Sequence, residues 1–104
     1  MMAFDDLVAA ARSAVASRQR LTPLKELREK TRSAPAARDV ASVLRAPGRV
    51  VSVIAEVKRA TATFADLSGV GDVAVLARFY EAGGAACVSV VTEPVRSHGR
   101  LTDL

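Results

Sequence analysis

Apolar residues recur at three- and four-residue intervals in the first part of the chain, which is the spacing of one helix face. The stretch from Phe4 to about Arg18 has such a face. It begins beside two acidic residues, Asp5 and Asp6, which suit the positive end of a helix. This pattern predicts an amphipathic helix.

Two shorter helices are expected next. Thr22 and Pro23 predict the N-cap and first position of a helix that ends in a basic turn before Pro35. Asp39 predicts the cap of a third helix, which Pro47-Gly48 brings to an end.

The pattern then changes to two continuous apolar runs, Val50–Val57 and Ala86–Val91. Both are too short and too rich in β-branched residues for helices, so we predict two buried strands. The segment between them has a helical pattern that Asp72 can cap and that Gly83-Gly84 can end with a left-handed residue. A strand, a crossover helix and a strand form a unit whose strands are parallel. The predicted class is therefore α/β.

The carboxyl end of the first predicted strand carries two opposite charges, Glu56 and Lys58. Because side chains alternate across a strand, both share a face with Ile54 and lie roughly 6 to 7 Å apart along the strand. Parallel α/β folds bind ligands at this end, where an acid and an amine can partly compensate each other. The alternative is that the strand emerges into solvent after Ala55 and that both charges are hydrated.

Composition limits what the chain can be. It has 104 residues, enough for one modest domain; half are hydrophobic and a quarter are charged, which is typical of a globular protein. No apolar run approaches the roughly 18 residues of a membrane span, and the N-terminus lacks the basic segment of a secretory signal. We therefore expect no membrane partner and a cytoplasmic location.

The net charge of +4 comes from basic residues mixed with acids, without the aromatic residues typical of a nucleic-acid surface. A hydrated helical face explains these charges, so we expect no nucleic-acid partner, while anionic substrates are compatible with them. The single cysteine, Cys87, allows no internal disulfide, and with one distant histidine it makes no zinc site. We expect Cys87 to be a small apolar residue in a strand.

A series of motifs resembles the indole-3-glycerol phosphate synthases. The run Val53-Ile-Ala-Glu-Val-Lys-Arg-Ala-Thr-Ala-Thr63 is similar to the signature of that family, in which an apolar run is followed by Glu-x-Lys and Ser-Pro-Ser. The similarity covers essentially the whole chain. The further matches, in chain order, are Leu44–Gly48, Leu76–Ala85, Val88–Glu93, Gly99 and Leu101–Leu104.

This resemblance implies an N-terminal fragment of a (β/α)₈ TIM barrel whose barrel is not closed. Residues 1–48 would be a helical extension and residues 49–104 the first βαβ portion. The family's enzymes close the pyrrole ring of 1-(2-carboxyphenylamino)-1-deoxyribulose 5-phosphate in tryptophan biosynthesis, with loss of CO₂ and water. They use no metal or organic cofactor.

The resemblance also implies site residues. Lys58 would stabilise developing negative charge or the substrate carboxylate, and Glu56 would orient the substrate or relay protons. Thr61 stands where the family's first motif serine contacts substrate, and Arg59 matches a basic position beside the lysine. We assign Thr61 and Arg59 to substrate binding, although Arg59, on the other strand face, is also explained as a surface charge.

Several residues near the expected site depart from the family's pattern. Thr61-Ala-Thr63 replaces Ser-Pro-Ser, and Phe64-Ala-Asp66 lacks the family's glycine, so this loop loses a proline restraint and a glycine's freedom. Ser97 replaces an aromatic residue that packs against the substrate ring, and Arg100 replaces a small residue. His98 lies in the same altered loop, where we expect solvent exposure rather than a catalytic proton carrier.

The chain is short for this function. A complete barrel takes about 250 residues, and the family's later catalytic lysine, catalytic glutamates and phosphate-binding loops have no counterpart here. We therefore expect little or no synthase activity from the chain alone. Two open strand edges favour self-association or pairing with a complementing chain. The alternatives are a non-catalytic remnant or partner-docking module derived from the enzyme, and a small basic nucleic-acid binder.

Overall fold

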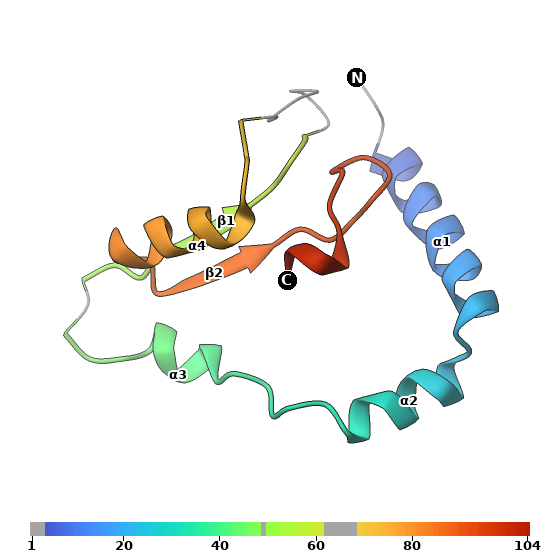
Figure 1. Cartoon of the computed structure of the whole chain (residues 1–104), viewed down its shortest axis with the longest axis horizontal. Helices are drawn as coiled ribbons and strands as arrows, with labels where there is room; N and C mark the ends of the chain where they lie inside the picture. Colours follow the sequence, from blue (N-terminus) through green and yellow to red (C-terminus); the bar gives the residue numbers. More distant parts are fainter. Residues whose placement is uncertain (1–3, 49, 62–68) are drawn as a thin grey trace. The chain divides into compact units, whose positions relative to one another are not determined.

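The computed structural model describes residues 4–48, 50–61 and 69–104 (Figure 1). The chain divides into two compact units, Met1–Arg38 and Asp39–Leu104, and each is described by itself. The predicted boundary after residue 48 follows the family resemblance and stays a prediction.

The first unit contains two helices, α1 (Phe4–Leu21) and α2 (Leu24–Arg32). Asp5 and Asp6 lie in the first turn of α1, where their charge complements the helix dipole. The helix runs slightly further than the sequence pattern predicts. No residue from 4 to 38 is buried.

The predicted start of α2 was wrong by one residue. Pro23, not Thr22, is the N-cap, with a ψ of 150° outside the helical range. The carbonyl of Pro23 accepts the first helical hydrogen bond from the N–H of Leu27 at 3.1 Å. The N–H of Thr22 instead donates to the carbonyl of Arg18 at 2.8 Å, which continues the pattern of α1.

The second unit begins with α3 (Val40–Leu44). The predicted cap is confirmed: the carboxylate of Asp39 accepts hydrogen bonds from the backbone N–H and the hydroxyl of Ser42. These bonds lower the pKa of Asp39. The helix ends before Pro47, and Gly48 follows with a φ of +89°, a conformation that favours glycine.

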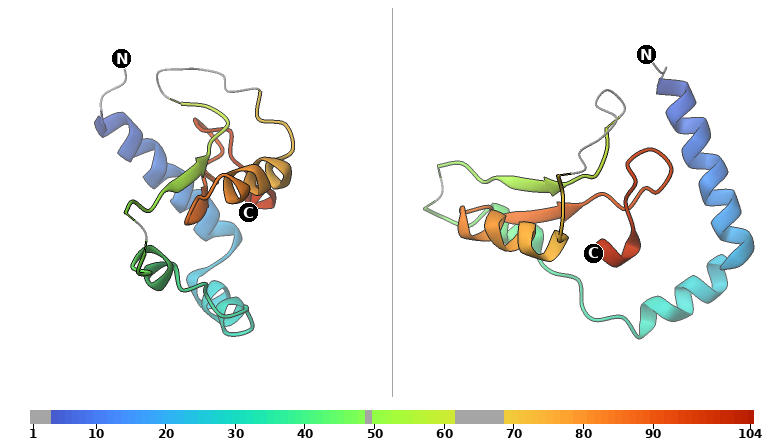
Figure 2. Two further views of the ribbon diagram at one scale, coloured as in Figure 1. Left: turned by 90° about the vertical axis from the view of Figure 1, so that its left-hand side faces the viewer. Right: turned by 45° about the horizontal axis from the view of Figure 1, so that its top comes forward.

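Two parallel strands form the sheet, β1 (Ile54–Val57) and β2 (Cys87–Val90). They run side by side, and α4 (Val73–Ala82) packs against them (Figure 2). In the register, Ile54 lies opposite Cys87 and Glu56 opposite Ser89. The α/β class and the parallel pairing are therefore confirmed for the described residues, which form an unclosed sheet.

The first strand is shorter than the predicted run from Val50 to Val57, and the prediction that this run is buried was wrong, because Val51, Val53 and Ile54 are exposed. Pairing with β2 begins where the carbonyl of Val53 accepts the N–H of Ala86 at 2.8 Å. Before this point, the hydroxyl of Ser52 donates to the carbonyl of Leu44 at 3.2 Å, which ties this segment to the end of α3. On the partner side, the N–H groups of Gly84 and Ala85 donate to the end of α4, so pairing cannot extend before Ala86.

Both ends of α4 have the structure that the sequence predicts. The carboxylate of Asp72 accepts the N–H groups of Ala74 and Val75 at 2.8 and 3.3 Å. At the other end, Gly84 has a φ of +94° and its N–H donates to the carbonyl of Glu81 at 2.9 Å. This is the left-handed ending that the glycine pair predicted.

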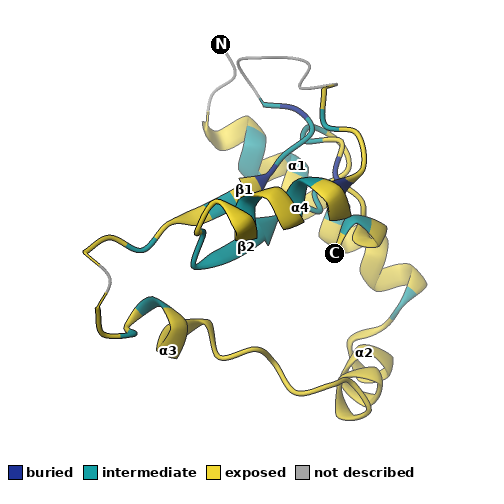
Figure 3. Ribbon diagram, turned by 60° about the vertical axis from the view of Figure 1, so that its left-hand side comes forward, coloured by how far each residue is buried: buried dark blue, intermediate teal, exposed yellow. Residues whose placement is uncertain are grey.

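The core of the second unit is small and lies close to the charged end of β1. Among the described residues, the buried apolar ones are Val57, Ala60 and Val73, exposed by 2%, 1% and 8%; Figure 3 colours the chain by burial. They lie at the end of β1, in the loop that follows, and at the start of α4. The buried apolar residues described in this unit therefore lie beside the residues to which the sequence assigned a function.

None of the helices in the described part of the chain is long and apolar enough to cross a membrane.

Candidate active site at the carboxyl end of the sheet

Glu56 and Lys58 form an ion pair at the carboxyl end of β1. The Lys58 Nζ lies 2.9 Å from the Glu56 Oε1. The alternation of side chains along a strand brings two residues that are two positions apart to the same face, as predicted. Both side chains are partly exposed, so water reaches the pair, but they are joined rather than separately hydrated.

The second strand adds a hydroxyl to this pair. Ser89 lies opposite Glu56 in the register, and its Oγ lies 3.4 Å from the Glu56 Oε2 as a donor. The hydrogen bond from Lys58 is the main cause that lowers the pKa of Glu56, and Ser89 adds to it against the opposing effect of burial. Glu56 is therefore held as a carboxylate between an ammonium group and a hydroxyl.

Thr61 follows this pair in the loop after β1. It is half-buried, three residues beyond Lys58 and next to the buried Ala60. The expectations for Ala62, Thr63 and the segment from Phe64 to Asp66 lie outside the described residues. Thr61 is thus the last residue of the motif loop that the structure describes on the strand side.

Arg59 does not extend into solvent as a surface charge. Its Nε and Nη2 donate to the Oδ2 and Oδ1 of Asp103 at 2.9 and 2.8 Å. Its Nη1 also donates to the carbonyl of Val70 at 3.2 Å. The hydrogen bonds to Asp103 raise the pKa of Arg59, and the hydrogen bonds from Arg59 lower the pKa of Asp103.

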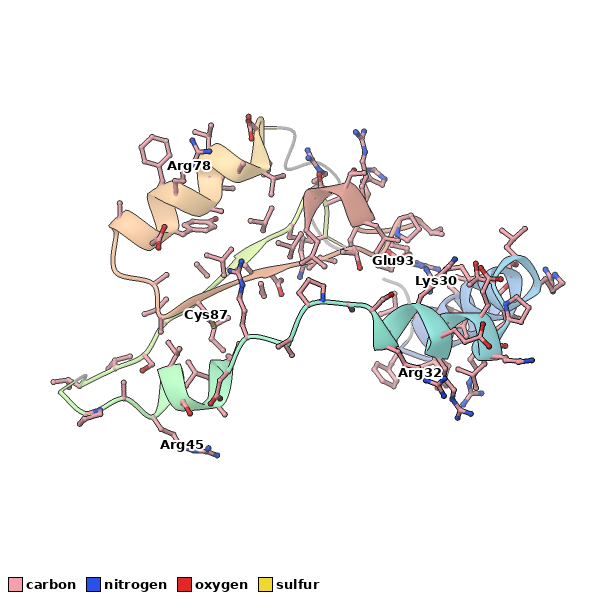
Figure 4. The ribbon with its side chains drawn as sticks, turned by 60° about the horizontal axis from the view of Figure 1, so that its bottom comes forward. Lys30, Arg32, Arg45, Arg78, Cys87 and Glu93 are labelled. Atoms are coloured by element: carbon pink, nitrogen blue, oxygen red, sulfur yellow. The ribbon has the colours of Figure 1, made fainter. Side chains whose placement is uncertain are left out.

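The loop after β2 is built around the carboxylate of Glu93, which is labelled in Figure 4. Its Oε1 accepts the N–H of Val95 at 2.8 Å, and its Oε2 accepts the N–H groups of Arg96 and Ser97 at 2.8 and 2.9 Å. Burial raises the pKa of Glu93, but these three donors outweigh it, so its pKa lies below the usual value. From the sequence, Glu93 was named only as the last residue of the family-like run Val88–Glu93.

Gly99 closes this loop against the end of β2. Its N–H donates to the carbonyl of Glu93 at 2.9 Å, and a Cβ at this position would stand 2.0 Å from the carbonyl oxygen of Val91. No side chain fits there. His98 precedes it with a φ of +52° and is exposed, as the sequence analysis expected. The turn η1 (Leu101–Asp103) then brings Asp103 to Arg59.

Three residues that complete this end of the sheet were not among the predicted site residues: Ser89, Glu93 and Asp103. Ser89 could have been found only from the strand register, which the hydrophobic pattern leaves open. Asp103 lies 44 residues from Arg59, so no local spacing links them. Glu93 next to Pro94 does carry a signal, because an acidic side chain at a turn can accept N–H groups further along the chain.

Among residues 4–48, 50–61 and 69–104, no group of three or more histidine, cysteine, aspartate or glutamate side chains is arranged to hold a metal ion. Cys87 is a free, half-buried residue of β2, in line with the predicted strand position.

Comparison with known proteins identifies the family. Residues 4–104 match the protein family described as "Indole-3-glycerol phosphate synthase". The chain belongs to this family. The resemblance that the ordered motifs indicated is therefore confirmed.

Relatives in the indole-3-glycerol phosphate synthase family share close to half of the aligned residues. The chain is 44% identical over 100 residues to the indole-3-glycerol phosphate synthase of Mycolicibacterium gilvum strain PYR-GCK, and 45% identical over 100 residues to that of Mycobacterium avium strain 104. Each alignment covers 96% of this chain and 36% of the relative. The Streptomyces griseus enzyme is 42% identical over 104 residues, which are 38% of its length. The chain thus spans little more than a third of these indole-3-glycerol phosphate synthases.

Proposed function

We propose that this chain forms the N-terminal portion of an indole-3-glycerol phosphate synthase. Residues 1–48 would be its helical extension, and residues 49–104 would be the opening βαβ portion of a (β/α)₈ TIM barrel. The proposed reaction closes the pyrrole ring of 1-(2-carboxyphenylamino)-1-deoxyribulose 5-phosphate and releases CO₂ and water. The family membership and the coverage of one third of the relatives support this reading.

The single observation that carries the proposal is the ion pair between Glu56 and Lys58 at the carboxyl end of β1. In barrel enzymes, the carboxyl ends of the strands form the catalytic rim. The family signature that this run resembles has a glutamate and a lysine two residues apart, and in this strand the two side chains are in contact at 2.9 Å. The pair faces the same side as Ser89 of the neighbouring strand.

Each polar group has a proposed role. The Lys58 ammonium stabilises negative charge that develops in the transition state, or the carboxylate of the substrate. Glu56, held as a carboxylate, keeps Lys58 in place and accepts or passes a proton. The hydroxyl of Thr61 is proposed to contact the substrate, as the motif serine does in the family.

For Arg59 we propose a role other than the substrate contact that the sequence predicted. Its Nε and Nη2 donate to Asp103, and its Nη1 donates to the carbonyl of Val70. All three guanidinium nitrogens therefore already donate hydrogen bonds within the chain. A substrate anion would have to compete with the carboxylate of Asp103. We therefore propose that Arg59 acts on the site through the loop geometry.

The substrate implied by this function is a small anion with a carboxylate and a phosphate. No partner nucleic acid or membrane is part of the proposal, and the location that fits a phosphorylated biosynthetic intermediate is the cytoplasm.

The test is a chimaera in which this chain replaces the matched 100 residues of the Mycolicibacterium gilvum relative. We expect the chimaera to form indole-3-glycerol phosphate, which is followed by indole fluorescence. Replacing the Lys58 ammonium by Lys58→Ala is expected to lower kcat by about 100-fold or more, because a preorganised charge at the reacting centre is lost. The isolated 104-residue chain is expected to show little or no turnover.

The matched control is Arg78→Ala, which removes an exposed positive charge from α4 (Figure 4) and leaves Glu56 and Lys58 intact. The proposal is wrong if the chimaera is folded by circular dichroism but inactive while its parent is active. It is equally wrong if Lys58→Ala turns over as fast as the Arg78→Ala control.

A second candidate is a partner-docking module derived from the enzyme. Two strands with open edges and exposed apolar residues favour it: Val53 is 52% exposed and Ile54 is 54% exposed. This function predicts that the purified chain elutes as a self-associated species in size exclusion with light scattering. A monomer that stays monomeric at high concentration would argue against self-association.

A further inference from the structure

A two-pronged contact joins the two loops at the carboxyl end of the sheet. Arg59 is the residue after Lys58 in the loop that follows β1, and Asp103 belongs to the turn η1 beyond β2. The Nε and Nη2 of Arg59 meet the Oδ2 and Oδ1 of Asp103 at 2.9 and 2.8 Å. Both prongs of the guanidinium are used, so the geometry fixes the direction of the side chain as well as its position.

This pair, the Arg59–Asp103 clasp, is more enclosed than a usual surface ion pair. The side chains are 24% and 9% exposed, respectively. The Asp103 Oδ2 also accepts the N–H of Arg100 at 3.2 Å, which fixes the carboxylate within η1. The third contact, from Arg59 to the carbonyl of Val70, joins the segment that leads into α4.

The clasp acts on a short piece of backbone whose ends are already fixed. Val57 and Ala60, on either side of Lys58 and Arg59, are the two least exposed residues of the core. A buried residue at each end and a clasped side chain between them leave little freedom to the backbone that carries Lys58. The direction in which the Lys58 side chain leaves the strand is then set by this segment.

We infer that Arg59 and Asp103 are positioning residues, which hold the backbone after β1 so that the ammonium group of Lys58 stays against Glu56. The catalytic meaning of Lys58 rests on the proposed function. The positioning itself does not, because it concerns a contact within this chain.

The experiment measures how the Glu56 carboxyl titrates, by ¹³C NMR on the complete 104-residue chain. The hydrogen bond from Lys58 is the main cause of the lowered pKa of Glu56, so this carboxyl reports where the ammonium group is. The chain is compared with Arg59→Ala, Arg59→Lys and Asp103→Asn. Arg78→Ala is the matched control, since it removes one exposed positive charge away from the clasp.

The two sides of the clasp separate positioning from plain charge effects. Through-space electrostatics alone would raise the pKa of Glu56 when Arg59 loses its charge and lower it when Asp103 loses its charge. Positioning instead predicts that the pKa of Glu56 rises by about half a unit in both Arg59→Ala and Asp103→Asn, because both variants release Lys58. Arg59→Lys keeps the charge but not the two-pronged geometry, so positioning predicts a rise there too.

In the double variant Arg59→Lys with Asp103→Asn, we expect the pKa of Glu56 to be no higher than in the single variants, because the two residues act as a unit. Arg78→Ala should leave the titration unchanged. A fall or no change in Asp103→Asn, in a chain whose amide spectrum stays dispersed, overturns the inference. If Arg59→Ala fails to fold, Arg59→Lys and Asp103→Asn decide the question by the same signs.

This result is independent of the proposed reaction. If the chimaera were inactive, the pKa of Glu56 measured in this chain and its variants would stay the same. Conversely, if the chimaera is active but Asp103→Asn leaves the pKa of Glu56 unaltered, the proposed reaction stands and the positioning role of the clasp is wrong.

Discussion

The two units of the chain differ in how far apart in sequence their polar contacts reach. In residues 4–38, the contacts we describe join neighbours along a helix, such as Lys30 with Glu26 at 2.7 Å and Arg20 with Ser17 at 3.0 Å. In residues 39–104, Glu56 is bonded to Ser89 and Arg59 to Asp103, across 33 and 44 residues. The described polar contacts of the first unit thus lie within single helices, whereas those of the second unit also join strands and loops that are distant in sequence.

The two units differ in burial in the same way. No residue from 4 to 38 is buried, whereas Val57, Ala60 and Val73 are buried in the second unit. Isolated helices of the length of α2 are marginal in water unless an apolar face is covered. Among the described residues, the packed centre therefore belongs to the second unit, and it lies at the candidate active site.

The largest expected effect comes from Gly99→Ala in the second unit. The new Cβ would stand 2.0 Å from the carbonyl oxygen of Val91, a rigid backbone atom, so the loop must move away from the strand. We expect the free energy of unfolding, measured with urea, to fall by about 3 kcal/mol or more.

Gly71→Ala is the control for this change, because a Cβ at that position meets no heavy atom within 4 Å. It should leave the unfolding free energy nearly unchanged. Equal effects of the two substitutions would mean that the loop after β2 is not packed against the strand, and the contrast between the units would weaken.

The next effect concerns Glu93 and is dependent on pH. In the folded chain its pKa lies below the usual value of 4.5, so Glu93 contributes stability above about pH 4.5 that is lost as the pH falls through the folded pKa. Glu93→Gln keeps the shape but leaves one oxygen for three N–H donors. We expect it to lower the unfolding free energy at pH 7 by about 1 to 2 kcal/mol.

The acid limb of the stability curve checks this explanation. Since Gln does not titrate, the difference between the wild-type chain and Glu93→Gln should shrink as the pH drops from 5 toward 3. Unfolding is followed by urea titration at each pH, with Glu81→Gln on α4 as an exposed control. A difference that stays constant with pH would show that the carboxylate charge is not the cause.

Much of the fold follows from local chemistry in the sequence. Asp39 and Asp72 cap helices because a carboxylate can reach the N–H groups two and three residues ahead. Gly84 ends α4 because its φ of +94° suits glycine. The pairing of Glu56 with Lys58 follows from the two-residue period of a strand, which needs no knowledge of the rest of the molecule.

The features that the sequence did not predict are contacts between residues that lie far apart in the sequence. The hydrophobic run begins at Val50, but its pairing begins only at Val53, because the N–H groups of Gly84 and Ala85 donate to the end of α4. The contact of Arg59 with Asp103 was not predicted, because Asp103 is distant in sequence and reaches Arg59 only through the turn η1. Such contacts depend on loop geometry, which spacing does not encode.

A smaller effect is expected at the start of α4. Asp72→Ala removes the acceptor for the N–H groups of Ala74 and Val75, which should cost about 1 kcal/mol of unfolding free energy. Asp72→Asn keeps an acceptor oxygen and should retain most of the stability. If Asp72→Asn is as damaging as Asp72→Ala, the charge or another contact of Asp72 matters more than the cap.

The smallest effect is expected in the first unit, at the ion pair between Lys30 and Glu26. The side chains are 62% and 48% exposed and lie one helical turn apart, so Lys30→Ala should change the unfolding free energy by only about 0.3 kcal/mol. The loss should shrink further in high salt. Lys25→Ala removes the same group from the first turn of α2, where a positive charge is unfavourable, and should be neutral or slightly stabilising. A loss well above 1 kcal/mol for Lys30→Ala would mean that α2 is packed against something, and that the first unit is held by more than its own helices.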